Sequence, residues 1–190
     1  MDYLSILDFM VNFIFNALVA LIIGVASAVL GNFIPRGPLD CERIPFRPFR
    51  WERDGAAYDL FQIEKWKDKL PDISVYVKSV FPKHVEPNLA RKRTYYARFA
   101  KETCVSEIVH VALILVSPVY LLVNWNEAWG IAAMVIDIVV NIPFIMVQRY
   151  NRPRLMRIAR RVRLQNEGKI DMTGDNTKKG DIHSYANHTL

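Results

Sequence analysis

The 190-residue chain contains few of the side chains that bind metals or form disulfides. Its two cysteines, Cys41 and Cys104, are far apart in the sequence, so their spacing indicates neither a disulfide framework nor a zinc cluster. Four histidines are too few to ligate a histidine-rich di-iron cluster of the desaturase kind. Internal repeats are also missing. A short chain without repeats is expected to form one compact unit.

Positive charge is missing from the beginning of the chain. No lysine or arginine precedes Arg36, and all 25 basic residues lie between Arg36 and Leu190. The whole chain is nevertheless 52% hydrophobic with a formal charge of +6. This combination is unusual for a soluble domain and ordinary for a small basic membrane protein.

Three apolar runs approach the length that crosses a bilayer. Phe9–Phe33 has 25 residues and no charge, Val105–Val123 has 19 residues, and Gly130–Val147 has 18 residues. A helix of about 20 apolar residues spans about 30 Å of hydrocarbon. We therefore predict an all-α integral membrane protein with about three transmembrane helices and additional interfacial amphipathic helices.

The distribution of charge predicts the orientation of these helices. With three spans, every basic residue lies on one side if the amino terminus and the loop 124–129 face outward, which makes the basic segments cytoplasmic. We predict a multi-pass protein of the cell membrane. In an alternative interpretation the first run is a signal peptide cleaved at Ala26-Ser27-Ala28. The missing positive n-region and the long apolar stretch favour an uncleaved anchor.

Composition and periodicity divide the chain into four parts. Ala56–Lys69 has helical spacing, 72–95 is compatible with helix or strand, and Arg91–Thr103 is predicted to run into the second span. Beyond Arg154, arginines opposite an apolar face predict an interfacial helix that binds anionic lipid. The polar end of the chain predicts disorder. The four parts are an anchor (1–34), a cytoplasmic or interfacial segment (35–104), a two-helix transmembrane hairpin with a basic amphipathic helix (105–165) and a disordered tail (166–190).

Glu107 and His110 form the densest candidate site. They are three residues apart, so a helix places them on one face near the start of the second span. Ionisable groups are costly inside a bilayer and persist where they face protein or a wet cavity. We predict that His110 is a general base for an acceptor hydroxyl, while Glu107 orients its imidazole. A structural Glu–His hydrogen bond explains the same spacing.

Other assignments of these residues remain open at this point. A di-iron centre also uses Glu-x-x-His, but it needs a second such motif and two further glutamates. Cys104 is an alternative acyl-accepting nucleophile if its thiol pKa is lowered, although buried cysteines are more often inert. Asp137 and Asn141, four residues apart in the third run, either bond to Glu107 or His110 or simply join two helices.

The third apolar run ends in a polar, arginine-rich stretch, Gln148–Arg154, that we expect to form a turn. Arginine binds phosphate and carboxylate bidentately, and activated acyl donors carry phosphate. It also stabilises oxyanions. A stop-transfer run explains the basic residues alone, but it does not explain Gln148, Tyr150, Asn151 and Pro153.

Two motifs in the chain resemble those of the glycosyl-4,4'-diaponeurosporenoate acyltransferases, small bacterial membrane proteins of carotenoid biosynthesis. The family pattern is E-T-x-R-A-E-x-x-H-W followed by N-x-P-x-x-x-x-Q-R-Y-N-R-P-R. The chain departs from it at Val105, Ser106 and Val111. The resemblance covers most of residues 30–163, including the "RWERDG" and "WKDKLPD" stretches. The matching residues are Glu102, Thr103, Glu107, His110, Asn141, Pro143 and all of Gln148–Arg154.

The resemblance implies that a fatty acyl group is transferred to a sugar hydroxyl of a glycolipid or glycosyl carotenoid. The implied partners are a fatty acyl donor (acyl-CoA or acyl carrier protein) and a lipid-soluble glycoside, beside anionic membrane lipid. We expect no cofactor, no metal and no nucleic acid. The predicted catalytic residues are His110, Glu107 and Glu102, and the predicted substrate-binding residues are Arg149, Asn151, Arg152, Arg154, Gln148, Trp66 and Asp68.

Two other functions are compatible with the sequence. A non-catalytic membrane scaffold, or a protein that binds anionic lipid, explains the basic tail and the amphipathic helices equally well. A metal-dependent membrane oxidoreductase is a further alternative.

Overall fold

A computed structural model describes residues 3–70 and 94–186, with side chains described as far as Gln165. These residues form helices, turns and no strand, which confirms the all-α prediction. Of the segment 72–95, expected to be helix or strand, residues 72–93 lie outside the described residues. The helices are α1 (Tyr3–Phe33), η1 (Arg50–Phe61), α2 (Ile63–Trp66), η2 (Lys67–Lys69), α4 (Tyr95–Val116), α5 (Val119–Val123) and α6 (Glu127–Ala186).

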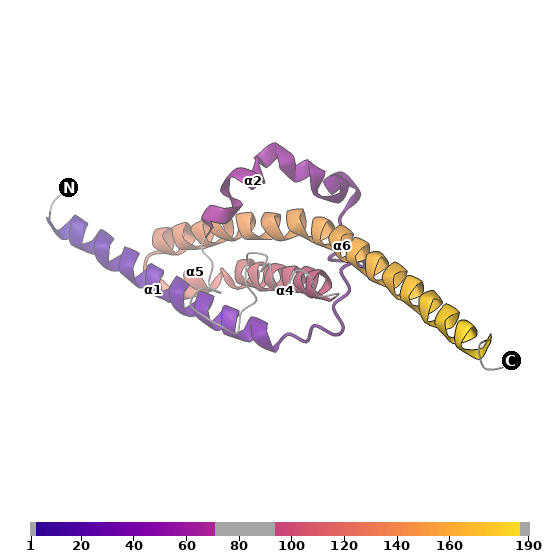
Figure 1. Cartoon of the computed structure of the whole chain (residues 1–190). Helices are drawn as coiled ribbons and strands as arrows, with labels where there is room; N and C mark the ends of the chain where they lie inside the picture. Colours follow the sequence, from indigo (N-terminus) through magenta and orange to yellow (C-terminus); the bar gives the residue numbers. More distant parts are fainter. Residues whose placement is uncertain (1–2, 71–93, 187–190) are drawn as a thin grey trace.

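The centre of the fold is an antiparallel pair made by α4 and α6, which share the most extensive contacts in the described chain. Short α5 reverses the chain between them, while η1 and α2 lie along another side of α6 (Figure 1). The antiparallel register is visible in the side-chain pairs: His110 meets Asn141, Glu107 meets Arg149, and Thr103 meets Arg152. Polar side chains at three levels therefore occupy one seam.

Two helices are long and apolar enough to cross a membrane: α1 and the part of α6 that ends at Gln165. Gly31 is the one buried residue of α1, so the apolar side chains of this helix are largely exposed in the isolated chain. A β-carbon at Gly31 would lie 3.0 Å from Val109 Cγ2, so glycine permits the close approach of α1 to α4. The second predicted span, which corresponds to α4 with α5, stays a prediction.

Polar contacts hold α1 at its middle and at its carboxyl-terminal end. Asn16 and Asn124 exchange side-chain hydrogen bonds of 2.9 and 3.0 Å. At the carboxyl-terminal end of α1, Arg36 Nη1 donates to the carbonyls of Gly31, Asn32 and Ile34. The last turn of a helix leaves carbonyl groups without intrahelical partners, and this guanidinium satisfies several of them.

The predicted helix at Ala56–Lys69 is interrupted. The chain instead forms a 3₁₀ stretch, one turn of α-helix and a second 3₁₀ turn, with Gln62 at a φ of 50° between the first two. Gly55 has a φ of 91°, and a β-carbon there would lie 3.1 Å from the Tyr150 carbonyl. Glycine allows both the left-handed backbone and the contact with α6. The spacing of apolar residues does not reveal that Gly55 and Gln62 need positive φ angles, so it predicted an uninterrupted helix.

The expected turn at Gln148–Arg154 is wrong, because α6 runs through this stretch as one helix. Helix α6 contains Pro143 and Pro153, which each lack the backbone N–H that would donate within the helix. Packing of α6 against α4 and η1 stabilises the helix despite these two missing hydrogen bonds. The basic amphipathic helix predicted after Arg154 continues the same element, which reaches Ala186 and includes most of the segment expected to be disordered. The four-part division of the chain stays a prediction.

Candidate active site

His110 lies in the seam between α4 and α6, where an amide orients its imidazole. Nδ1 of His110 is 2.7 Å from Asn141 Oδ1, and the ring stacks on Phe144 at 4.5 Å between centroids. Asn141 Nδ2 donates to the Asp137 carbonyl at 2.8 Å, so the amide oxygen is the atom that faces the histidine. This arrangement assigns the proton of a neutral imidazole to Nδ1 and leaves a lone pair on Nε2.

The predicted pairing of Glu107 with His110 is wrong. Glu107 Oε1 accepts from Arg149 Nη1 at 2.6 Å, and Oε2 accepts from Arg152 Nη2. Guanidinium groups from the facing helix bind both carboxylate oxygens, and ionised partners make stronger hydrogen bonds than a neutral imidazole does. The alternative bond between Asn141 and His110 is confirmed.

Glu52 is a buried carboxylate that the sequence analysis did not single out. It is 1% exposed and accepts from Arg149 Nε at 2.5 Å, from Arg149 Nη2 at 2.9 Å and from Tyr58 Oη at 2.5 Å. Burial by itself raises the pKa of Glu52, but these bonds and the Phe49 amide outweigh burial and hold the pKa below its usual value. Glu52 is therefore ionised at neutral pH.

Arg149 and Arg152 join the two glutamates into one buried network, called the arginine–glutamate quartet below (Glu52, Glu107, Arg149 and Arg152). Two positive and two negative charges balance within it. The arginines also donate to the backbone carbonyls of Pro45, Phe46 and Arg47, which ties the loop before η1 to α6. Arg152 Nε donates to Thr103 Oγ1 at 2.9 Å.

Because its members are buried and bonded to one another, the quartet does not present a free guanidinium fork. Arg152 is 1% exposed and Arg149 is 9% exposed. Buried ion pairs often gain little net stability, since desolvation offsets the Coulomb attraction, yet removing one partner costs about 3–5 kcal/mol. The quartet therefore fixes the register of three segments more than it offers a ligand site.

The other predicted site residues lie outside the quartet. Glu102 pairs with Arg36 at 3.0 Å, at the junction between α1 and α4. Arg154 pairs with Asp59 at 3.1 Å and covers the Tyr150 ring. Trp66 donates its indole N–H to the Phe61 carbonyl. Gln148 and Asn151 are partly buried in α6, and Asp68 is exposed. Whether any of them contacts substrate stays a prediction.

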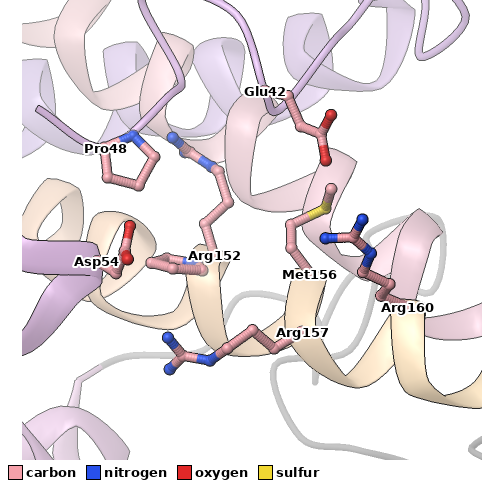
Figure 2. A pocket seen from close by; sticks show the side chains of 8 residues that line it. Glu42, Pro48, Asp54, Arg152, Met156, Arg157 and Arg160 are labelled. Atoms are coloured by element: carbon pink, nitrogen blue, oxygen red, sulfur yellow. The ribbon is translucent and has the colours of Figure 1, made fainter.

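A pocket of about 220 Å³ opens beside the quartet, at the end of the seam away from His110. Figure 2 shows Glu42, Met156 and Arg160 on one side and Pro48 and Asp54 on another. Arg157 and Arg160 are exposed, and neither forms an ion pair in the described part of the chain. The lining residues are Glu42, Pro48, Asp54, Arg152, Pro153, Met156, Arg157 and Arg160.

Cys104 is 0% exposed, which leaves this thiol inaccessible as an acyl-accepting nucleophile. Within 3–70 and 94–165, where side chains are described, no group of three or more histidine, cysteine, aspartate or glutamate side chains is placed to hold a metal.

The fold and the site define a class: a helical, membrane-associated protein with an oriented imidazole in its central seam. Comparison with known proteins identifies the family within this class. The chain belongs to the glycosyl-4,4'-diaponeurosporenoate acyltransferase family, whose model matches residues 43–161. The matched region contains the quartet together with His110 and Asn141.

Individual relatives agree with the family match. Proteins named glycosyl-4,4'-diaponeurosporenoate acyltransferase from Staphylococcus aureus strains bovine RF122 / ET3-1, Newman and COL are each 28% identical to the chain over 149 residues. The matched region covers 77% of this chain and 87% of each relative. No solved structure matches the chain.

Proposed function

We propose that the chain is a membrane O-acyltransferase that joins a fatty acyl group to a sugar hydroxyl of a glycolipid or glycosyl carotenoid. The observation that carries this proposal is the geometry of His110, whose Nδ1 is held by Asn141 in a chain of this family. The relatives are named for acyl transfer to a glycosyl carotenoid acid, which supports the acceptor class.

In the proposed reaction, His110 acts as the general base. Nε2 takes the proton of the acceptor hydroxyl while its oxygen attacks the carbonyl of the acyl donor. The imidazolium then returns the proton to the leaving group, which for a thioester donor is a thiol. Asn141 Oδ1 keeps accepting the Nδ1 proton throughout. A positioned general base contributes roughly 10²–10⁴-fold in rate.

The quartet has a supporting role in this proposal. Glu107 lies one helical turn before His110 on α4, and its two oxygens bind α6 through Arg149 and Arg152. The same arginines hold the loop before η1. Fixing α4 against α6 fixes the distance between His110 and Asn141, and proximity of oriented groups lowers the barrier without new chemistry.

The donor's anionic group is assigned to the pocket at Arg157 and Arg160. These arginines are exposed in the pocket, whereas Arg149 and Arg152 donate to the protein itself. Asn141 and Arg157 are 16 residues apart on α6, about 24 Å at 1.5 Å per residue. A donor with an extended arm, such as a thioester of coenzyme A or of a carrier protein, reaches across such a distance.

The proposed topology has three spans, with α4 and α5 together forming the second, and its basic segments in the cytoplasm. All lysines and arginines then lie on one side of the bilayer. The lipid-soluble acceptor enters from the bilayer, and the donor binds from the cytoplasm.

Lipid analysis of cells that express His110→Ala tests the function. The variant is expected to insert normally and to form no ester, while His183→Ala, which changes a histidine in the carboxyl-terminal tail, is expected to form normal amounts. Chromatography of extracted lipids measures both. Normal ester in the His110→Ala strain would exclude the proposed base and favour a non-catalytic scaffold.

A further inference from the structure

Two thiols that the proposed reaction does not use lie in contact with each other. Cys41 Sγ and Cys104 Sγ are 3.3 Å apart, although the residues are separated by 63 positions in the sequence. Both are free and buried. They join the non-helical segment after α1 to helix α4, and they pack against Ala100 and Leu155. This non-bonded contact therefore brings together two segments that are far apart in the sequence.

We propose that Cys41 and Cys104 form a redox modification site, at which a hydroperoxide converts the two thiols into an intramolecular disulfide. The sulfur of Cys41 attacks the peroxide, the O–O bond breaks, and one alcohol or water leaves as Cys41 becomes a sulfenic acid. The sulfur of Cys104 then forms the S–S bond and expels water. The two thiols lose two electrons in total, which the peroxide gains.

The surroundings favour Cys41 as the thiol that reacts first. It is 7% exposed, whereas Cys104 is 0% exposed. The hydrogen bond with Cys104 lowers the pKa of the Cys41 thiol against the effect of burial, and the positive charges of Arg152 and Lys101 lower it further. The thiolate is the nucleophilic form of cysteine. Cys104 then acts as the resolving thiol from 3.3 Å away.

The bond requires a small movement on one side of the contact. A disulfide has an S–S distance of about 2.05 Å, so the sulfur atoms must approach by roughly 1.3 Å. Residues 34–49 form turns and bends, while Cys104 is inside α4, so the loop is the element that moves. The cytoplasmic side keeps thiols reduced, and the cross-link there is a transient response to oxidant.

The cross-link acts on the wall of the pocket. Glu42 follows Cys41 and lines the pocket, and Met156, which also lines it, packs on the same apolar cluster as the two thiols. Oxidation therefore ties the Glu42 side of the pocket to α4.

Thiol counting on the purified full chain tests the proposal directly, because the sequence contains only two cysteines. After treatment with hydrogen peroxide and then denaturation, monomeric protein is expected to react with no maleimide and to weigh 2 Da less. Dithiothreitol should restore two reactive thiols. We expect the reaction to be at least tenfold faster in the folded chain than in chain unfolded by dodecyl sulfate.

Proteolysis and single variants locate the bond. Trypsin cleavage after exposed Arg43 separates Cys41 from Cys104, so the fragments should stay joined on a non-reducing gel and separate after reduction. Cys41→Ser and Cys104→Ser should each abolish the 2 Da loss in monomer. Persistence of two reactive thiols, a sulfinic product without the 2 Da loss, or equal rates in folded and unfolded chain would each overturn the proposal.

Discussion

The seam between α4 and α6 contains two polar regions that differ in how completely their hydrogen-bonding groups are used. At the quartet, two arginines and two glutamates bind one another from three segments of the chain. At His110, one nitrogen is held by Asn141, and no hydrogen bond to Nε2 is recorded within the described residues. The difference shows that the region densest in charge uses its charged groups to bind the chain to itself, whereas the proposed base at His110 keeps Nε2 without a partner among the described residues.

The largest expected effect comes from leaving one charge of the quartet unbalanced. Arg149→Met or Glu52→Leu should each destabilise the protein by about 3–5 kcal/mol, because a buried ion loses its partner. The double variant should recover part of this loss. Thermal unfolding in detergent measures all three.

Arg154→Met is the matched control for the quartet variants. It removes an ion pair with Asp59 whose side chains are 31% and 59% exposed, and such pairs contribute about 0–1 kcal/mol. If Arg149→Met destabilised the protein no more than Arg154→Met does, the buried ion pairs of the quartet would not stabilise the fold.

Removing the amide that orients His110 should lower turnover while the fold persists. Asn141→Leu loses the acceptor for Nδ1–H, and we expect ester formation to fall roughly tenfold or more, within the range that a general base contributes. Phe144→Leu keeps the acceptor and loses the ring stacking, so its effect should be smaller. Equal losses in the two variants, measured as initial rates of ester formation, would mean that packing rather than the hydrogen bond orients the ring.

Acid should weaken the quartet through Glu52. Its pKa is depressed in the folded protein, so its contribution to stability is complete above the ordinary value of 4.5 and is lost as the pH falls through the lower folded value. Unfolding temperatures measured from pH 7 to pH 3 should therefore fall in acid. Glu52→Gln should show a shallower fall than the unchanged protein. An identical pH profile in the two proteins would contradict this assignment.

The smallest expected effect is at the pocket. Arg157→Gln and Arg160→Gln should each raise the KM for the acyl donor a few-fold and leave kcat unchanged, because exposed charges interact weakly across water. Arg161→Gln alters an exposed arginine that does not line the pocket. A similar KM change in that control would indicate a general effect of basic charge, such as attraction of the chain to anionic lipid.

The sequence predicts the helical class, and it predicts that residues of the second and third apolar runs lie together. It assigns the wrong hydrogen-bond partner to Glu107. The rule that residues three apart share a helix face places Glu107 beside His110 correctly. It does not reveal that α6 presents two guanidinium groups to that carboxylate and an amide to that ring. Those contacts depend on the register between two helices, which no local pattern contains.

Glu52 was missed for a related reason. It lies in a stretch rich in proline, arginine and aromatic residues, without the periodicity that marks a buried face. Its burial results from the left-handed backbone at Arg53, Asp54 and Gly55, which brings η1 against α6. The available signal was composition: a carboxylate in a stretch rich in arginine is a natural ion-pair partner.

Arg36 combines two tasks that are usually assigned to different residues. It is the first cation after the amino-terminal helix, so in the proposed topology its positive charge helps to keep this flank in the cytoplasm. Its guanidinium group also donates hydrogen bonds to the last turn of α1 and to the carboxylate of Glu102. Lysine at this position would keep the positive charge but could not make all of these hydrogen bonds. Arg36→Lys therefore separates the effect of the charge on membrane insertion from the effect of the hydrogen bonds on the packing of α1 against α4.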